Sequence, residues 1–311
     1  MKDRFVRFDW AIKRLLRQKA NFGVLEGFLT VFLGEKVTIV DILESESNQQ
    51  DEFDKFNRVD IKARNSKGEI IIVEVQNTSE VFYLERILYG VAKAITEHIS
   101  LGDDYGEVKK VYSISVLYFD LGEGDDYLYK GQTNFFGIHT NDELKITTRQ
   151  RDAIVRKAPE EIFPTYYLIR VNNFDRVAVS PMEEWMRYLK KGEISADAKA
   201  PGLQEAREKL LYYQMDPAER HAYDEHLNAV MIQNDVLGNA RAEGLAEGRA
   251  EGRAEGRIEG RAEGKAEGLA EGKTSQQMLT ARTMLSDGMS IDLVAKYTGL
   301  TKSQIEAFAA E

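Results

Sequence analysis

The chain has 311 residues, 43% of them hydrophobic and 10% aromatic, which is enough for a sizeable core and for more than one domain. Its formal net charge is −10, so a nucleic-acid binder of this composition would need a local basic strip. There is no cysteine, no apolar run of about eighteen residues, and no apolar signal core after Met1. We therefore expect a cytoplasmic protein without disulfides, cysteine-based zinc sites or membrane spans.

Hydrophobic periodicity predicts an α/β domain in the first two thirds of the chain. Apolar residues recur every three or four positions in the expected helices, and Gly34 and Gly102 are placed to end two of them. In chain order we expect a helix over residues 8–33, a strand over 37–43, a polar loop over 44–55, strands over 58–63 and 68–76, a helix over 80–101, strands over 111–119, 134–139 and 166–172, and a helix over 181–190.

Two carboxylates in neighbouring strands are the most informative feature. Glu74 interrupts an aliphatic run that reads as a strand buried on both faces, where a carboxylate is costly unless a cation or donor meets it. Asp60 lies in the preceding strand, and a turn over residues 65–68 would bring the two acids together. Such a pair can bind Mg2+, which prefers carboxylate oxygens and keeps several waters. The pattern favours a metal-dependent nuclease, although Glu74 at an edge facing solvent is the simpler alternative.

The last third of the chain differs in composition. Residues 203–237 predict a polar helix that ends near Gly238, and residues 241–273 form a tetrapeptide array with eight Glu-Gly pairs. As a helix, the array would stack like charges four residues apart and would lose about 1 kcal/mol per glycine relative to alanine. We predict a long exposed helix steadied by self-association, with a flexible charged tether as the alternative. The domains expected are 1–195, a helical extension over 196–240, the array over 241–273, and a small helical tail over 274–311.

The tail has the layout of a helix-turn-helix. Gly299 would make the turn, Leu300, Ile305 and Phe308 would close a small core, and Thr301 would cap the second helix. That would leave Ser303 and Gln304 free to face a DNA groove. Because the segment is slightly acidic, a packing or oligomerisation element is the alternative.

Several segments occur in an order typical of a known family. They are Asp9-Trp10-Ala11-Ile12-Lys13, Asp60 followed by Ile72-Val73-Glu74-Val75-Gln76, Arg86-Ile87-Leu88-Tyr89, Leu101-Gly102 with Tyr105 and Val111-Tyr112-Ser113-Ile114, Tyr167-Leu168-Ile169-Arg170-Val171-Asn172, and Glu184-Trp185. Together with the order of elements, they resemble the PD-(D/E)xK nuclease superfamily, and more narrowly its bacterial transposase-like or recombination-promoting branch. The resemblance covers roughly residues 5–190. One position departs from the superfamily pattern, because Gln76 stands where lysine is usual.

The resemblance implies a restriction-endonuclease-like αβββαβ core with a mixed sheet, followed by an all-α C-terminal region. It implies a Mg2+-dependent DNA endonuclease, with Mn2+ as a possible substitute and DNA as the partner. Asp60 and Glu74 would hold the metal, and Gln76 would join them as a catalytic residue by orienting water. Either Asp9 or Glu26 would supply a further acid from the first helix, and the sequence does not choose between them.

Three alternatives remain open at this stage. Arg86 would contact a DNA phosphate or, instead, be an ordinary surface cation or a partner of Glu85 or Glu80. Asp9 would be no more than a helix N-cap. The whole chain would be a catalytically weak or inactive nuclease fold used for binding and assembly, with homo-oligomers formed through its C-terminal helices.

Overall fold

The computed structural model describes residues 4–44, 59–150 and 153–309, which divide into two compact units, residues 1–230 and 231–311. Most of the polar loop expected over residues 44–55 lies outside the described residues. Among the helices of the described residues, none has both the length and the apolar composition needed to cross a bilayer.

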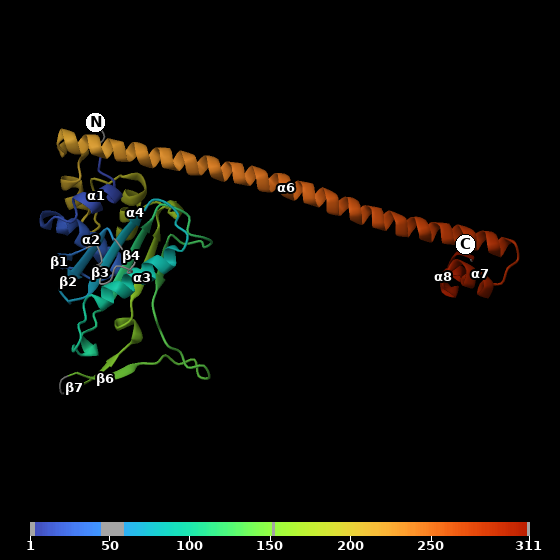
Figure 1. The fold of residues 1–311 in the computed structure, drawn as a ribbon, viewed down its shortest axis with the longest axis horizontal. Helices are drawn as coiled ribbons and strands as arrows, with labels where there is room; N and C mark the ends of the chain where they lie inside the picture. The colour runs from blue at the N-terminus through green and yellow to red at the C-terminus, as the bar shows by residue number, and fades with distance from the viewer. Residues whose placement is uncertain (1–3, 45–58, 151–152, 310–311) are drawn as a thin grey trace. The chain divides into compact units, whose positions relative to one another are not determined.

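The first unit is built on a mixed sheet with helices on both faces (Figure 1). Its helices are α1 (Phe8–Arg14), α2 (Phe22–Leu33), α3 (Tyr83–Thr96), α4 (Pro181–Lys191), α5 (Leu203–Lys209) and the first part of α6 (Pro217–Ser286). Its strands are β1 (Ile39–Leu43), β2 (Ile61–Asn65), β3 (Ile70–Gln76), β4 (Val111–Leu117), β5 (Leu128–Gly131), β6 (Ile146–Gln150), β7 (Ala153–Lys157) and β8 (Thr165–Arg170).

Six of the strands form one sheet in the order β1-β2-β3-β4-β8-β5. The pairs β3–β4 and β4–β8 are parallel, whereas the other three pairs are antiparallel. Strands β6 and β7 pair only with each other. The elements from α1 to β4 therefore follow the predicted αβββαβ order, with the expected N-terminal helix present as α1 and α2, and the sheet is mixed as predicted.

Strand β3 is buried on both faces because helices cover both sides of the sheet. Ile71 and Val73 join the main core, to which α1, α2 and α4 contribute. Ile70 and Ile72 pack instead with residues of α3. Side chains alternate between the faces of a strand, so Glu74 faces α3.

Two helices expected to be continuous are each interrupted. The helix expected over residues 8–33 breaks between α1 and α2, where the Asn21 side chain donates to the Leu15 carbonyl and residues 17–21 offer little apolar surface to the core. The helix expected over 203–237 breaks after α5, because the backbone of Leu210 and Tyr212 pairs with Val6 and Arg4. The chain then continues in α6 through Gly238, so the predicted end near that glycine is wrong.

Two further predictions need correction. The segment 134–139 is not a strand, since Phe136 forms only an isolated bridge to Glu143 and Ile138 is almost fully exposed. The neighbouring strand is β5, which was not predicted. Helix α3 ends at Thr96, ahead of Gly102, which adopts a positive φ in the loop beyond it. By contrast, Gly34 does end α2, with a φ of 74°.

The second unit contains the rest of α6, α7 (Ile291–Thr298) and α8 (Lys302–Ala309). Its core consists of Ala281, Val294, Leu300 and Ile305. Gly299 adopts a φ of 73° between α7 and α8, which is the predicted turn. Array residues 241–273 are helical and exposed throughout.

Candidate active site

The antiparallel register of β2 and β3 brings the two predicted acids together. Ile61 pairs with Val73, so Asp60, the residue before β2, lies across from Glu74. Asp60 is fixed there by a 2.7 Å hydrogen bond that its Oδ2 accepts from the backbone N–H of Val75. The turn that sets this register is closed by Asn65, whose side-chain oxygen accepts hydrogen bonds from two backbone N–H groups.

Glu74 is an almost fully buried carboxylate, with 7% of its surface exposed. Burial is the main reason that its pKa rises to about 7, and the negative charges of Asp60 and Glu80 add to the rise, while Arg86 opposes it. A guanidinium nitrogen of Arg86 lies 3.2 Å from Glu74 Oε2. A buried acid with a raised pKa at the edge of a cavity is a feature of functional sites.

Gln76 lies in a network that links β3 to α3. Its Nε2 donates to Glu80 Oε1 at 2.7 Å, and its Oε1 accepts a longer, 3.5 Å contact from Arg86. The second oxygen of Glu80 lies 3.1 Å from Arg86 Nε. Arg86 is thus held by Glu74, Gln76 and Glu80, so its predicted pairing with a nearby glutamate is present in the structure.

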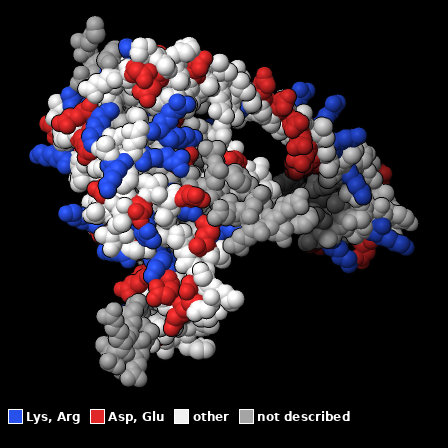
Figure 2. Space-filling model, turned by 60° about the vertical axis from the view of Figure 1, so that its left-hand side comes forward, with Lys and Arg blue, Asp and Glu red and all other residues white. Residues whose placement is uncertain are grey.

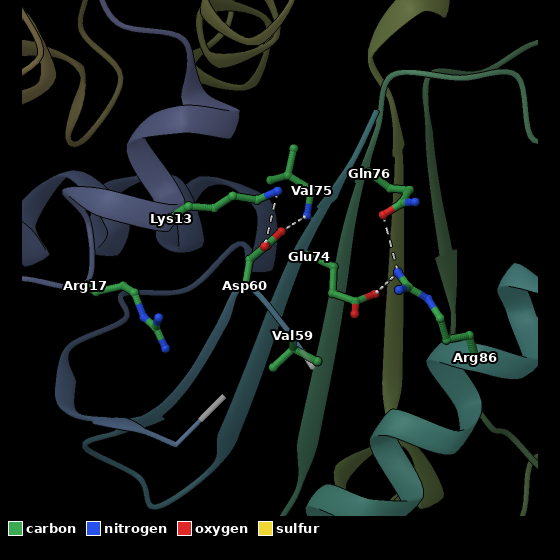
Figure 3. A pocket seen from close by; sticks show the side chains of 8 residues that line it. All are labelled: Lys13, Arg17, Val59, Asp60, Glu74, Val75, Gln76 and Arg86. Atoms are coloured by element: carbon green, nitrogen blue, oxygen red, sulfur yellow. Dashed lines mark hydrogen bonds and ion pairs between the residues drawn. The ribbon is translucent and has the colours of Figure 1, made fainter. Parts of the chain in front are cut away.

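These side chains line a cavity of about 380 Å³ (Figure 3). Figure 3 shows Asp60 and Glu74 on adjacent strands, with Gln76 and Arg86 beyond Glu74. Lys13 of α1 and Arg17, which follows α1, line the same cavity, and Lys13 Nζ lies 3.6 Å from Asp60 Oδ1. Sequence reasoning gave no role to Lys13 or Arg17, although Lys13 ends the quoted N-terminal segment. It considered Glu80 only as a partner of Arg86.

The donor set of the cavity suits a hard divalent cation. Asp60 and Glu74 offer carboxylate oxygens, and each is already met by a cationic side chain, so the site accepts positive charge. No group of three or more metal-binding side chains is found within the described ranges. Mg2+ needs no such group, because it is often held by one or two carboxylates, with water and phosphate oxygens completing its shell.

Neither candidate acid of the first predicted helix lines the cavity. Glu26, on α2, accepts a 2.7 Å hydrogen bond from the backbone N–H of Ile39 and so anchors β1. Asp9 is not an N-cap either, since Arg7 occupies that position of α1. It is fully buried and is bonded to Arg7, to Asn77 and to His226 of α6. His226, which its spacing would assign to the surface, is therefore a partner of a buried acid.

The tail keeps its predicted turn but not its predicted free side chains. Gln304 Oε1 accepts hydrogen bonds from the backbone and the hydroxyl of Thr301, and Thr301 Oγ1 in turn accepts from the Gln304 N–H. This reciprocal cap engages Gln304 at the start of α8. The hydroxyl of Ser303 also contacts Thr301, so both side chains have partners within the helix.

Comparison with known families agrees with this geometry. Residues 6–148 match the family model described as PD-(D/E)XK nuclease family transposase, a range that includes Asp60, Glu74, Gln76 and Arg86. Residues 277–309 match that of the C-terminal HTH domain of the Rpn/YhgA-like nuclease family. Two separate parts of the chain are thus similar to nuclease families, the first to the PD-(D/E)XK nuclease family and the second to the Rpn/YhgA-like nuclease family. No curated protein and no solved structure matches the chain. The cavity therefore lies in the part of the chain that matches the PD-(D/E)XK family model, and the part that matches the HTH domain lies in the second unit.

Proposed function

We propose that this protein is a Mg2+-dependent DNA endonuclease. The observation that carries the proposal is that Asp60 and Glu74 converge in one cavity with Gln76 and the cations Lys13, Arg17 and Arg86. The two carboxylates would hold the metal, and Mn2+ would substitute for it. When bound, the metal would acidify a water and polarise the phosphate.

The reaction would be hydrolysis of a phosphodiester. The oxygen of a water molecule forms a bond to phosphorus, and the bond from phosphorus to one sugar oxygen breaks. That sugar oxygen ends as an alcohol with one proton of the water, and the other proton remains with the phosphate monoester or passes to solvent. Lys13 and Arg86 are placed to offset negative charge on the phosphate oxygens, and Gln76 to orient the water.

DNA affinity in an acidic chain requires local basic surface. Figure 2 shows Lys and Arg side chains gathered on one face of the first unit, although the chain as a whole carries a net charge of −10. The match to an HTH domain supports a second DNA contact through α7 and α8. We infer that the two units bind DNA together, and that the nuclease unit cleaves it in a recombination or transposition process.

A plasmid-nicking assay tests the proposal. Purified protein should nick supercoiled DNA with Mg2+ or Mn2+ and not with EDTA. Asp60→Ala and Glu74→Ala should each reduce the rate on the order of 100-fold or more, because each removes a proposed ligand of the metal. Glu85→Ala is the matched control, because Glu85 is an exposed acid on α3 that does not line the cavity. Equal nicking by all four proteins would refute the proposal.

One observation favours a second candidate, a nuclease fold used only for binding. Glu74 and Asp60 are already paired with Arg86 and Lys13, and position 76 lacks the usual lysine. Such a protein would bind labelled duplex DNA, as seen by fluorescence anisotropy, with equal affinity in Mg2+ and EDTA and without nicking. Binding that tightens with Mg2+ and leads to nicking would exclude it.

A further inference from the structure

The orientation of the Gln76 amide is set by partners whose roles are unambiguous. An ionised carboxylate can only accept hydrogen bonds, and a guanidinium can only donate them. Glu80 therefore accepts a 2.7 Å hydrogen bond from the amide NH2 group of Gln76, and a guanidinium nitrogen of Arg86 lies 3.5 Å from the amide oxygen. The contact with Glu80 is short and charge-assisted, whereas the contact with Arg86 is at the limit of a hydrogen bond. Glu80 is thus the partner that decides which way the amide points.

We propose that Glu80 is a positioning residue that makes Gln76 a hydrogen-bond acceptor in the cavity. Glu80 accepts a hydrogen bond from the amide NH2 group of Gln76. The amide oxygen of Gln76 therefore lies toward Arg86, as Figure 3 shows. This inference rests on the proposed hydrolysis for its catalytic meaning. The positioning itself is a property of the free protein.

An acceptor at position 76 acts differently from the lysine that is usual there. The oxygen of Gln76 can accept a hydrogen bond from one O–H of the attacking water and so aim the lone pair of that water at phosphorus. No proton passes to the amide, because an amide oxygen is a weak base, so the proton balance of the hydrolysis is unchanged. A lysine ammonium only donates and cannot hold the water in this way.

A neutral side chain at position 80 could not keep both contacts of the Glu80 carboxylate. Its Oε1 accepts a hydrogen bond from Gln76, and its Oε2 forms an ion pair with Arg86, whose Nε lies 3.1 Å away. A glutamine at position 80 has one oxygen and one NH2 group, so it can place an oxygen toward only one of these two side chains, and it has no charge to pair with Arg86. Glu80→Gln should therefore release either Gln76 or Arg86.

A reciprocal exchange tests this arrangement without changing the net charge. Glu80→Gln and Gln76→Glu, made singly, should each lower the Mg2+-dependent nicking rate by roughly tenfold or more. The double variant restores every donor–acceptor pair: the new NH2 group at position 80 faces the new carboxylate at position 76, and both Arg86 contacts keep an acceptor. Its rate should return to within roughly threefold of wild type. A double variant as slow as the slower single variant would overturn the proposal.

A second measurement needs neither metal nor DNA. In protein labelled selectively with 15N-glutamine, the side-chain NH2 resonances of Gln76 are those lost in Gln76→Leu. They should move in Glu80→Gln, because the carboxylate acceptor is gone, and should stay in place in the control Glu85→Gln, which alters an exposed acid on α3. Unchanged Gln76 resonances in a folded Glu80→Gln protein would overturn the positioning role.

The two measurements separate failure of the inference from failure of the proposed activity. If wild-type protein does not nick DNA but the Gln76 resonances depend on Glu80, the endonuclease proposal is wrong and the positioning stands. If wild-type protein nicks DNA and the Gln76 resonances do not change in Glu80→Gln, the positioning role of Glu80 is wrong and the endonuclease proposal stands. Thermal unfolding of each variant checks that loss of activity is not loss of fold.

Discussion

At the scale of single residues, the first unit contains two buried carboxylates whose pKa values shift in opposite directions. Burial raises the pKa of Glu74 to about 7, and one guanidinium contact does not offset it. Burial also favours the neutral form of Asp9, but the hydrogen bond from His226 and the charge of Arg7 outweigh it and hold the pKa of Asp9 well below its usual range. The negative charge of Asp9 is thus compensated by its partners, whereas the negative charge of Glu74 is compensated only in part.

The raised pKa of Glu74 predicts that this residue lowers stability at alkaline pH. Between its ordinary value of 4.5 and about 7, the folded state holds a proton that the unfolded state has released, so stability falls as pH rises through that window. The loss is on the order of 3 kcal/mol at pH 8. Urea unfolding in EDTA should show a shallower pH dependence for Glu74→Gln, and a stability at pH 8 equal to or above wild type, with nicking abolished. A variant with wild-type pH dependence would contradict this assignment.

The lowered pKa of Asp9 predicts the opposite behaviour. Its stabilisation is fully present above the ordinary pKa of 3.8 and is lost only as pH falls below that value. Asp9→Asn should therefore destabilise the protein at pH 7 by about 3 kcal/mol, since it leaves the partly buried Arg7 guanidinium without its counter-charge. Glu225→Gln is the matched control, because it removes an exposed carboxylate paired with His221 on the same helix. It should cost below about 0.5 kcal/mol.

Sequence reasoning located Asp60, Glu74, Gln76 and Arg86 of the cavity but not most of the contacts that hold them. Asp60 and Glu74 were predictable because strand alternation and a short turn fix the register that aligns them. The hydrogen bond from Gln76 to Glu80 was not predictable, because no periodicity specifies where a side chain in the segment between β3 and α3 will point. The pairing of Asp9 with His226 joins residues 217 positions apart in the sequence, so no local pattern indicates it.

At the scale of elements, the packing of α2 against the segment before α5 depends on two glycines. A Cβ added at Gly27 would lie 2.4 Å from backbone atoms of Gly202 and Pro201, which cannot move aside as a side chain can. Gly27→Ala should therefore destabilise the protein by about 2 kcal/mol. Gly23→Ala, one turn earlier on α2, meets only the flexible carboxylate of Glu205 and should be tolerated. Equal unfolding free energies for the two variants would show that α2 shifts freely.

Elements were predicted well where the hydrophobic period decides the structure and poorly where distant contacts do. Strand β3 followed directly from its aliphatic run. The break at residues 210–212 did not, because it is made by backbone pairing with residues 4–6 at the other end of the unit. The apolar segment 134–139 suggested a strand, but Phe135 and Phe136 remain exposed and pack on no sheet. Apolar composition alone does not show whether a partner strand exists.

At the scale of the whole molecule, the tetrapeptide array has no packing partner among the residues that the structure describes. Its residues are exposed, and a Cβ added to any array glycine, from Gly244 to Gly272, meets no atom within 4 Å. A helix with like charges four residues apart and glycine at every fourth position is poorly stable alone. A second chain lying against the glycine row would stabilise it. We therefore predict that the intact protein is an oligomer.

Deleting residues 241–273 should lower the mass seen by light scattering, while Mg2+-dependent nicking by the remaining protein is at least partly kept. A sharper variant replaces Gly252, Gly256, Gly260 and Gly264 with alanine. Each methyl group favours the isolated helix by about 1 kcal/mol and meets nothing in the single chain. If the glycine row is the contact between chains, the same methyl groups hold the partner away, so helicity in the monomer rises while association weakens. A variant that is more helical and equally associated would place the contact on another face, and an unchanged mass after the deletion would leave the array as a spacer.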